Sequence, residues 1–341
     1  MLQYLLKRFF LAAITLIIIM LVSYVLVRLA PGDPTQSTIL GENEGTAQGL
    51  STDKGALAKN LSLRAKLHLD EPILLGFLFW LKDVFLHGNL GTSASVDKGR
   101  PVASLIMERL PVTLWINIWA ILITYLLSIP IGIYSAVFPS SNFDRLLTFF
   151  LFFLYSLPVF WVALILQASV CEGGYYPVFP LKGIAITSIW GLSIWQILWN
   201  TAMHYTLPVF CLCYFGFAGL SRYAKSGMAD VVNQDYIRTA RAKGVPEHTV
   251  LFKHALRNAM IPLITLFAGL LPGLISGSII VEYVFSIPGM GSLSMLALTS
   301  RDIPLLMALF AFGGALTLAG ILLSDFLYVL VDPRITFNEK R

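Results

Sequence analysis

Long apolar runs separated by short polar segments dominate the 341-residue chain. A membrane-spanning helix needs about 20 mostly apolar residues, and the pattern predicts six such spans. We place them at Phe9–Leu29, Leu114–Val137, Leu146–Cys171, Tyr205–Leu220, Met260–Val284 and Leu305–Val331. The fourth span is short, so we interpret the tryptophan-rich stretch Ile184–Trp199 as an interfacial helix leading into it. The predicted fold class is an all-α membrane protein with six transmembrane helices.

Basic residues between the spans predict the orientation of the chain in the membrane. The N-terminus, the loop 138–145, the segment 221–258 and the C-terminal tail are short and basic, and a six-span arrangement puts all four on one side. Positive charge in short loops marks the cytoplasmic side, so both termini are predicted to be cytoplasmic. The long segment between the first two spans is then extracytoplasmic.

The same pattern divides the chain into four regions. They are 1–29, the cytoplasmic N-terminus and first span; 30–110, the extracytoplasmic segment; 111–335, a core of five spans that contains the cytoplasmic loop 221–258; and 336–341, the cytoplasmic tail. Within the extracytoplasmic segment we expect a flexible loop at Glu42–Lys59 and short helices at Leu61–Leu69 and Ile73–Leu86.

Composition supports a membrane protein and argues against nucleic-acid binding, disulfides and cysteine metal ligands. Hydrophobic residues make up 57% of the chain and charged residues 13%, whereas soluble domains have about a quarter charged. A net charge of +5 would suggest nucleic acid in a soluble protein, but beside spans such residues set topology, so no nucleic acid is expected. Cys171, Cys211 and Cys213 lie in or beside apolar runs, which predicts small buried residues rather than disulfides or metal ligands.

The segment 221–258 is a basic island between two apolar runs. Its first half, Ser226–Lys243, is predicted to be a helix, and Gly244 stands where a left-handed C-terminal cap belongs. Pro246 then stands where a second helix opens, and that helix continues through Ala259 toward the fifth span. The pattern predicts a helix–turn–helix elbow outside the membrane.

Two interpretations of this elbow remain open from the residues alone. It could dock a cytoplasmic partner, because small residues, apolar anchors and arginines alternate along it. These are Ala240, Ala242 and Gly244, then Tyr236 and Ile237, then Arg238 and Arg241. Alternatively, it is an ordinary solvated loop whose arginines only set the topology.

The island resembles the loop called the EAA motif in ABC-importer permeases, in the form found in the peptide branch. Thr239-Ala-Arg-Ala-Lys-Gly244 is followed by a turn and then, at the matching places, by His254, Asn258, Ala259 and Pro262. Arg238 stands where the general family has a glutamate, and Pro262 falls several residues late. Both departures are usual for the peptide branch, so they narrow the resemblance.

Other segments along nearly the whole chain resemble the same branch. They are Ala30-Pro-Gly-Asp-Pro34, Leu67-His-Leu-Asp-Glu-Pro72, Gly88-Asn-Leu-Gly-Thr92, Glu108-Arg-Leu-Pro-Val-Thr113, Glu282-Tyr-Val-Phe-Ser-Ile-Pro-Gly-Met-Gly291 and Ser324-Asp-Phe-Leu-Tyr-Val-Leu-Val-Asp-Pro-Arg334. Gly173-Gly-Tyr-Tyr176 with Phe179-Pro-Leu-Lys-Gly183 looks most like permeases for oligopeptides and microcin C.

The resemblance implies a type I ABC-importer permease subunit in the bacterial cytoplasmic (inner) membrane, forming half of a translocation pathway for peptides. It implies a homologous second permease, two ATP-binding subunits and an extracytoplasmic peptide-binding protein as partners. The chain has no Gly-x-x-x-x-Gly-Lys-Ser/Thr loop, so a non-catalytic role without cofactors is expected, with ATP hydrolysis on the partners. The residues implied to couple to the ATPase through a coupling helix are Asp235, Tyr236, Arg238, Thr239, Ala240, Arg241, Ala242, Lys243, Gly244, His254 and Asn258.

Glu282 and Tyr283, near the outer end of the fifth span, are candidates for the pathway or an outer gate. An intramembrane acid costs roughly 2.5–3.5 kcal/mol on insertion scales, which makes Glu282 a functional hypothesis. It could meet the amino terminus of a peptide or a loop of a partner.

Three other functions are weighed against the peptide permease. The first is a nickel or other small-solute ABC permease, which shares the pattern. The others are an ion-coupled transporter, for which we see no internal repeat, and a membrane enzyme, for which we see no catalytic motif.

Overall fold

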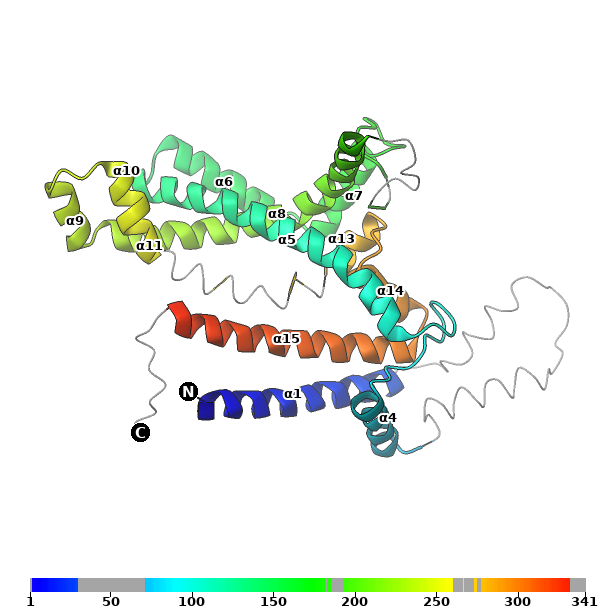
Figure 1. The fold of residues 1–341 in the computed structure, drawn as a ribbon. Coiled ribbons are helices and arrows are strands. Elements are labelled where there is room, and N and C mark those ends of the chain that lie inside the picture. The colour runs from blue at the N-terminus through cyan, green and yellow to red at the C-terminus, as the bar shows by residue number, and fades with distance from the viewer. Residues whose placement is uncertain are drawn as a thin grey trace. The chain divides into compact units, whose positions relative to one another are not determined.

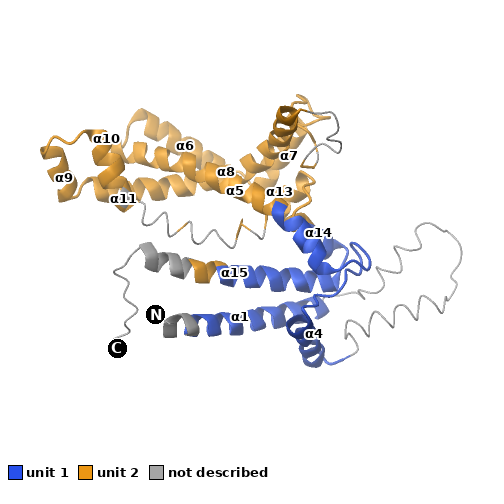
Figure 2. Cartoon of the chain, viewed as in Figure 1, with its two compact units in different colours: residues 1–111, 293–319 blue, residues 112–292, 320–341 orange. Residues whose placement is uncertain are grey.

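The computed structural model describes residues 2–29, 71–181, 183–184, 193–259, 266, 273–274 and 277–331. The chain forms two compact units, Met1–Pro111 with Leu293–Ala319 and Val112–Ser292 with Gly320–Arg341 (Figure 2). Several predictions lie outside the described residues: the loop Glu42–Lys59, the helix Leu61–Leu69, most of the fifth span and the tail 336–341.

The first unit is built from α1 (Leu2–Leu29), α4 (Ile73–His87) and the beginning of α15 (Ile303–Val331) (Figure 1). Its core includes Tyr24 and Phe77, whose rings meet edge to face with centroids 5.8 Å apart. The short helix predicted at Ile73–Leu86 is confirmed as α4. It ends at Gly88, which takes the left-handed conformation that a glycine cap adopts readily.

The second unit holds most of the long helix α5 (Val102–Val137) and the helices that pack around it. In chain order these are α6 (Asn142–Ser156), α7 (Val159–Val170), α8 (Ile194–Val232), α9 (Asp235–Ala242), α10 (Glu247–Thr249), the π-helical turn η1 (Val250–Ala255), α11 (Leu256–Ala259) and α13 (Ile279–Val284). The helix α8 contacts α6, α7 and α11, so it is the central element of this unit. A further helix, α14 (Met290–Thr299), crosses the boundary between the two units.

Within the described residues, four helices are long and apolar enough to cross a membrane. They contain Lys7–Leu29, Val102–Val137, Ile194–Val232 and Ile303–Leu323. A fifth span is present if the bent pair α6 and α7 is one span. These helices contain the first, second, fourth and sixth predicted spans, so the prediction of a multi-pass α-helical membrane protein is confirmed.

The third predicted span, Leu146–Cys171, is not one helix. The chain turns by 92° between α6 and α7. Leu157 takes an extended conformation before Pro158, which is itself the N-cap of α7. Proline lacks a backbone N–H and disfavours helical geometry in the residue before it, so the break falls at this position.

The fourth predicted span, Tyr205–Leu220, is only the middle of a 39-residue helix. Ser193 starts α8 with a capping box, in which Gln196 returns a hydrogen bond to the Ser193 backbone. Of the stretch predicted at Ile184–Trp199 to form an interfacial helix leading into the span, Ile194–Trp199 form the first turns of α8 and are continuous with the span. Residues 185–192 lie outside the described part of the chain.

The fifth predicted span does not continue as one helix to Val284. Gly277 has φ of +70° and Ser278 is extended, so α13 starts afresh at Ile279. A Cβ at Gly277 would overlap a carboxylate oxygen of Glu282. Gly277 combines a positive φ with a close approach to that carboxylate, and only glycine tolerates both demands.

Candidate functional site

The elbow predicted at 221–258 is formed by the end of α8 together with α9, α10, η1 and α11. The single helix predicted at Ser226–Lys243 is wrong, because α8 ends at Val232 and α9 begins at Asp235. Gln234 is extended at this break and its carbonyl accepts from the Ile237 N–H. The elbow therefore presents a separate eight-residue helix rather than the continuation of a span.

The turn after α9 has the predicted cap. Gly244 has φ of +75°. Its N–H donates to the Arg241 carbonyl at 2.9 Å, and the Val245 N–H donates to the Ala240 carbonyl at 3.3 Å. Pro246 is the N-cap of α10, so the second helix starts where the sequence placed it, although it passes into a π-helical turn at Val250.

Ile237 holds α9 onto the rest of the unit. Its side chain is fully buried in a cluster with Met228, Val250 and Ala255. The prediction that Ile237 offers an anchor to a partner is therefore wrong. Ile237 is the fully buried residue of α9, and the half-buried Ala240 packs against the same cluster, so these two residues define the inner side of the helix.

The implied coupling residues mostly lie on the exposed side of the elbow. Asp235, Tyr236, Arg238, Thr239, Arg241, Ala242, Lys243, Gly244 and Asn258 are exposed, whereas Ala240 and His254 are half-buried. The Asn258 amide donates to the Tyr236 hydroxyl at 2.7 Å. This bond joins α9 to α11, so two of the implied residues stabilise the elbow itself.

An ion pair closes the turn of the elbow. The Arg241 guanidinium donates to both carboxylate oxygens of Glu247, at 2.7 and 3.1 Å. These hydrogen bonds hold the pKa of Glu247 below its usual range and raise the pKa of Arg241. Arg238 is exposed and lies 3.7 Å from the Asp235 carboxylate, and Lys243 is also exposed, so the surface of the elbow carries charges of both signs.

Glu282 and Tyr283 lie together on α13 but have different environments. The Glu282 carboxylate is 3% exposed and accepts from the Thr113 hydroxyl and the Ser292 N–H, both at 3.0 Å. Thr113 in turn accepts from the Met290 N–H at 2.7 Å. Tyr283 is exposed. The Glu282 carboxylate therefore ties the segment after α13 to α5 from inside the protein.

A buried carboxylate in the first unit was not predicted. Asp302 is fully buried and accepts hydrogen bonds from the N–H groups of Ala94, Ser95 and Val96 at 3.0–3.1 Å and from the Ser93 hydroxyl. Its other oxygen accepts from the Leu305 N–H at the start of α15. An Asp before an apolar run signals such a cap, but no local pattern shows its partners in a loop some 200 residues earlier.

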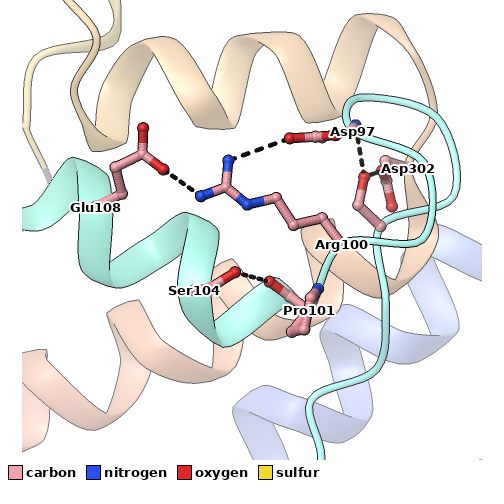
Figure 3. Close-up of polar contacts among 7 residues, drawn as sticks. Asp97, Arg100, Pro101, Ser104, Glu108 and Asp302 are labelled. Atoms are coloured by element: carbon pink, nitrogen blue, oxygen red, sulfur yellow. Dashed lines mark hydrogen bonds and ion pairs between the residues drawn. The ribbon is translucent and has the colours of Figure 1, made fainter.

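Figure 3 shows the polar contacts of the same loop with Asp302 and with the start of α5. Arg100 bridges two acids, Asp97 at 3.2 Å and Glu108 at 2.6 Å, so it links the loop to the first turns of α5. No group of three or more metal-binding side chains occurs among the residues that the structure describes.

Comparison with known proteins places these features in a family. The family described as "Binding-protein-dependent transport system inner membrane component" matches residues 128–337. The description "Binding-prot-dependent transport system membrane comp, N-term" matches residues 1–117. Together the two matches cover both units of the chain.

Curated relatives match over their full length. The chain is 38% identical over 339 residues to the oligopeptide transport system permease protein AppB of Bacillus subtilis (strain 168), covering 99% of this chain and 100% of AppB. It is 33% identical over 368 residues to the inner membrane ABC transporter permease protein YejB of Escherichia coli O157:H7, covering 99% of each. It is 30% identical over 341 residues to the dipeptide transport system permease protein DppB of Bacillus subtilis (strain 168), covering 100% of each.

Proposed function

Because the chain belongs to the family of binding-protein-dependent transport system inner membrane components, we propose that it is the transmembrane permease subunit of an ATP-driven peptide importer. It forms half of the pathway through which peptides cross the membrane. The full-length relatives whose names specify oligopeptide or dipeptide transport support this cargo class. The elbow is the observation that carries the coupling role.

The proposed topology has six spans in the bacterial inner membrane with both termini in the cytoplasm. Residues 1–29 contain the first span, 30–110 the extracytoplasmic segment, 111–335 the five-span core and 336–341 the tail. The distribution of basic residues supports this orientation. The spans in α1, α5, α8 and α15 are consistent with it.

The elbow docks an ATP-binding subunit, with α9 as the coupling helix. One side of α9 is exposed, whereas Ile237 and the Tyr236–Asn258 hydrogen bond hold the helix onto the rest of the elbow. Because α9 is packed rigidly against the rest of the elbow, a displacement of the ATP-binding subunit would move the membrane spans as well. A flexible loop at the same place would absorb that displacement. The continuous helix α8 is the route by which such a movement reaches the membrane.

The subunit is non-catalytic, and ATP hydrolysis takes place on its partners. The proposed complex contains a homologous second permease, two ATP-binding subunits and an extracytoplasmic peptide-binding protein. Tyr283, exposed beside the buried Glu282, is the side chain proposed to line the pathway or outer gate. Glu282 acts at the same place by positioning the segment that follows α13.

A pair of matched substitutions tests the coupling role. Ala242→Glu places a large acid on the exposed face of α9, and Ala103→Glu makes the same change at an exposed residue of the extracytoplasmic side. We expect Ala242→Glu to prevent co-purification of the ATP-binding subunit and transport-stimulated ATP hydrolysis. Ala103→Glu should leave both intact. Equal coupling in the two variants would exclude the elbow as the docking site.

A separate assay tests the cargo. Uptake of a labelled oligopeptide by proteoliposomes that contain the complete importer is expected, with no uptake of nickel. Nickel uptake without peptide uptake would overturn the cargo and leave the coupling role standing.

A further inference from the structure

A partly open cleft, of about 300 Å³ when the solvent at its mouth is included, lies between α5, α6 and α8 in the second unit. Its apolar lining comes from Ile131, Leu151 and Ala218, and its polar lining includes Arg222 and Lys225. Both cations lie further along α8 than Ala218. Apolar side chains and two cations therefore line the same cleft.

Arg222 and Lys225 lie where the apolar part of α8 stops. No Asp, Glu, Lys or Arg occurs between Ile194 and Ser221 of α8, and Arg222 is the first. None occurs between Leu146 and Val170, whereas Asp144 and Arg145 stand at the start of α6. A cation that begins the polar part of a membrane helix lies at the level of the lipid headgroups.

The two cations of the cleft differ in what neutralises them. Lys225 donates to both carboxylate oxygens of Asp144, at 2.8 and 2.9 Å, so its charge is balanced within the protein. Arg222 has no carboxylate within ion-pair distance among the described residues. Its guanidinium carbon lies 4.9 Å from the centroid of the Phe152 ring. That contact leaves the guanidinium N–H groups to bind an anion.

We propose that this cleft binds an anionic phospholipid, with the headgroup phosphate on Arg222 and an acyl chain along the apolar lining. A phosphodiester carries one negative charge, which matches the single uncompensated cation. Guanidinium donates to phosphate oxygens in pairs, so the match is geometric as well as electrostatic. This proposal requires only that the protein lies in a membrane, and it does not depend on which substrate the importer transports.

Lipid binding to the full-length chain in detergent, followed by native mass spectrometry, tests the proposal. The probes are phosphatidylglycerol and, as the zwitterionic comparison, phosphatidylcholine. Arg222→Gln removes the proposed phosphate ligand, and Arg145→Gln makes the same charge change on a neighbouring exposed residue outside the cleft. We expect Arg222→Gln to weaken phosphatidylglycerol binding roughly tenfold or more, because one charge-assisted contact is lost. Arg145→Gln should change it less than about threefold, and Arg222→Lys should retain part of the binding.

Four results would overturn the proposal. The first is an equal loss of phosphatidylglycerol binding in Arg222→Gln and Arg145→Gln, which would show that the lipid is attracted to positive charge in general. The second is equal binding of phosphatidylcholine by the unaltered chain. The third is displacement of the lipid by millimolar inorganic phosphate, which would identify a soluble anion as the ligand. The fourth is loss of the bound lipid when the complete importer assembles, which would show that a partner segment fills the cleft. Size-exclusion and thermal unfolding of each variant verify that it remains folded.

Discussion

The Thr113 hydroxyl donates a hydrogen bond of 3.0 Å to the Glu282 carboxylate, across 169 positions of sequence. The same hydroxyl oxygen accepts from the Met290 N–H, so one threonine connects α5, α13 and the first residue of α14. Both side chains are buried, Thr113 completely. One hydroxyl group therefore joins α5 to the region around residues 282–290, which is far away in sequence.

Replacing this hydroxyl by a methyl group should destabilise the protein. Thr113→Val keeps the shape but removes both hydrogen bonds of the hydroxyl, to the Glu282 carboxylate and from the Met290 N–H, which should cost about 2 kcal/mol or more. Thermal unfolding of the full chain in detergent measures the effect. Thr206→Val is the control, because its exposed hydroxyl bonds only to the Ala202 carbonyl of its own helix. Equal stability of the two variants would show that the Thr113 network is not structural.

Gly289 packs closely against Thr113 and Glu282, so adding a side chain at this position should also destabilise the protein. A Cβ at Gly289 would lie 2.5 Å from Thr113 Oγ1 and closer still to a Glu282 oxygen. Gly289→Ala should therefore cost roughly 1–3 kcal/mol through overpacking. Gly219→Ala, inside α8 with open space around the added Cβ, should instead stabilise by about 0.5–1 kcal/mol. The two variants should shift the unfolding temperature in opposite directions, and a shared direction would contradict the packing argument.

Asp302 predicts the largest loss of stability in the first unit. Asp302→Ala removes the acceptor of three loop N–H groups and the cap of α15, at a cost of about 3 kcal/mol or more. The loop around Ser93 should become open to limited proteolysis. Asp97→Ala, which removes a half-exposed acid from the same loop, should cost less than about 1 kcal/mol. Proteolysis at equal rates in both variants would show that Asp302 does not hold the loop.

The Arg241–Glu247 pair predicts how the elbow responds to pH. The folded-state pKa of Glu247 is lowered by Arg241, so the pair stabilises the elbow above the unfolded-state pKa of about 4.3. That contribution is lost as the pH falls through the lower folded-state pKa. Both side chains are more than a third exposed, so solvent screening limits it to at most about 1 kcal/mol.

Hydrogen exchange of residues 235–258 at pH 7 and near pH 3 measures this loss. The unaltered elbow should lose protection at the lower pH more than Glu247→Gln does, because the variant has no such pair at either pH. An identical pH response in the two proteins would contradict the role assigned to the pair.

Local signals in the sequence predicted several elements of the fold correctly. Gly244 caps α9 because the residue after a helix often takes the left-handed conformation, which glycine adopts easily. This requirement is local, so the sequence alone reveals it. The short helix α4 followed from the spacing of its apolar residues. The errors at Pro158 and at Gln234 concern continuity. An apolar run shows that a segment enters the membrane, but not whether its backbone stays in one helix.

In the candidate site too, the sequence identified local features but not contacts between distant residues. Residue types and spacing identified the basic elbow and its resemblance to importer permeases. They did not show that Ile237 faces inward, because that depends on Val250 and Ala255 beyond the turn. They identified Glu282 as an unusual acid but not its partner Thr113, and they did not identify Asp302 at all.

The sequence by itself determined the membrane class, the family and the chemical character of the elbow, because each depends on composition and on patterns within a few dozen residues. Only the tertiary structure decided which polar and apolar side chains are used within the chain and which remain for partners. Thr113 and Glu282, like Ser93 and Asp302, meet across long stretches of sequence, and whether a buried carboxylate finds its donors depends on how distant helices pack.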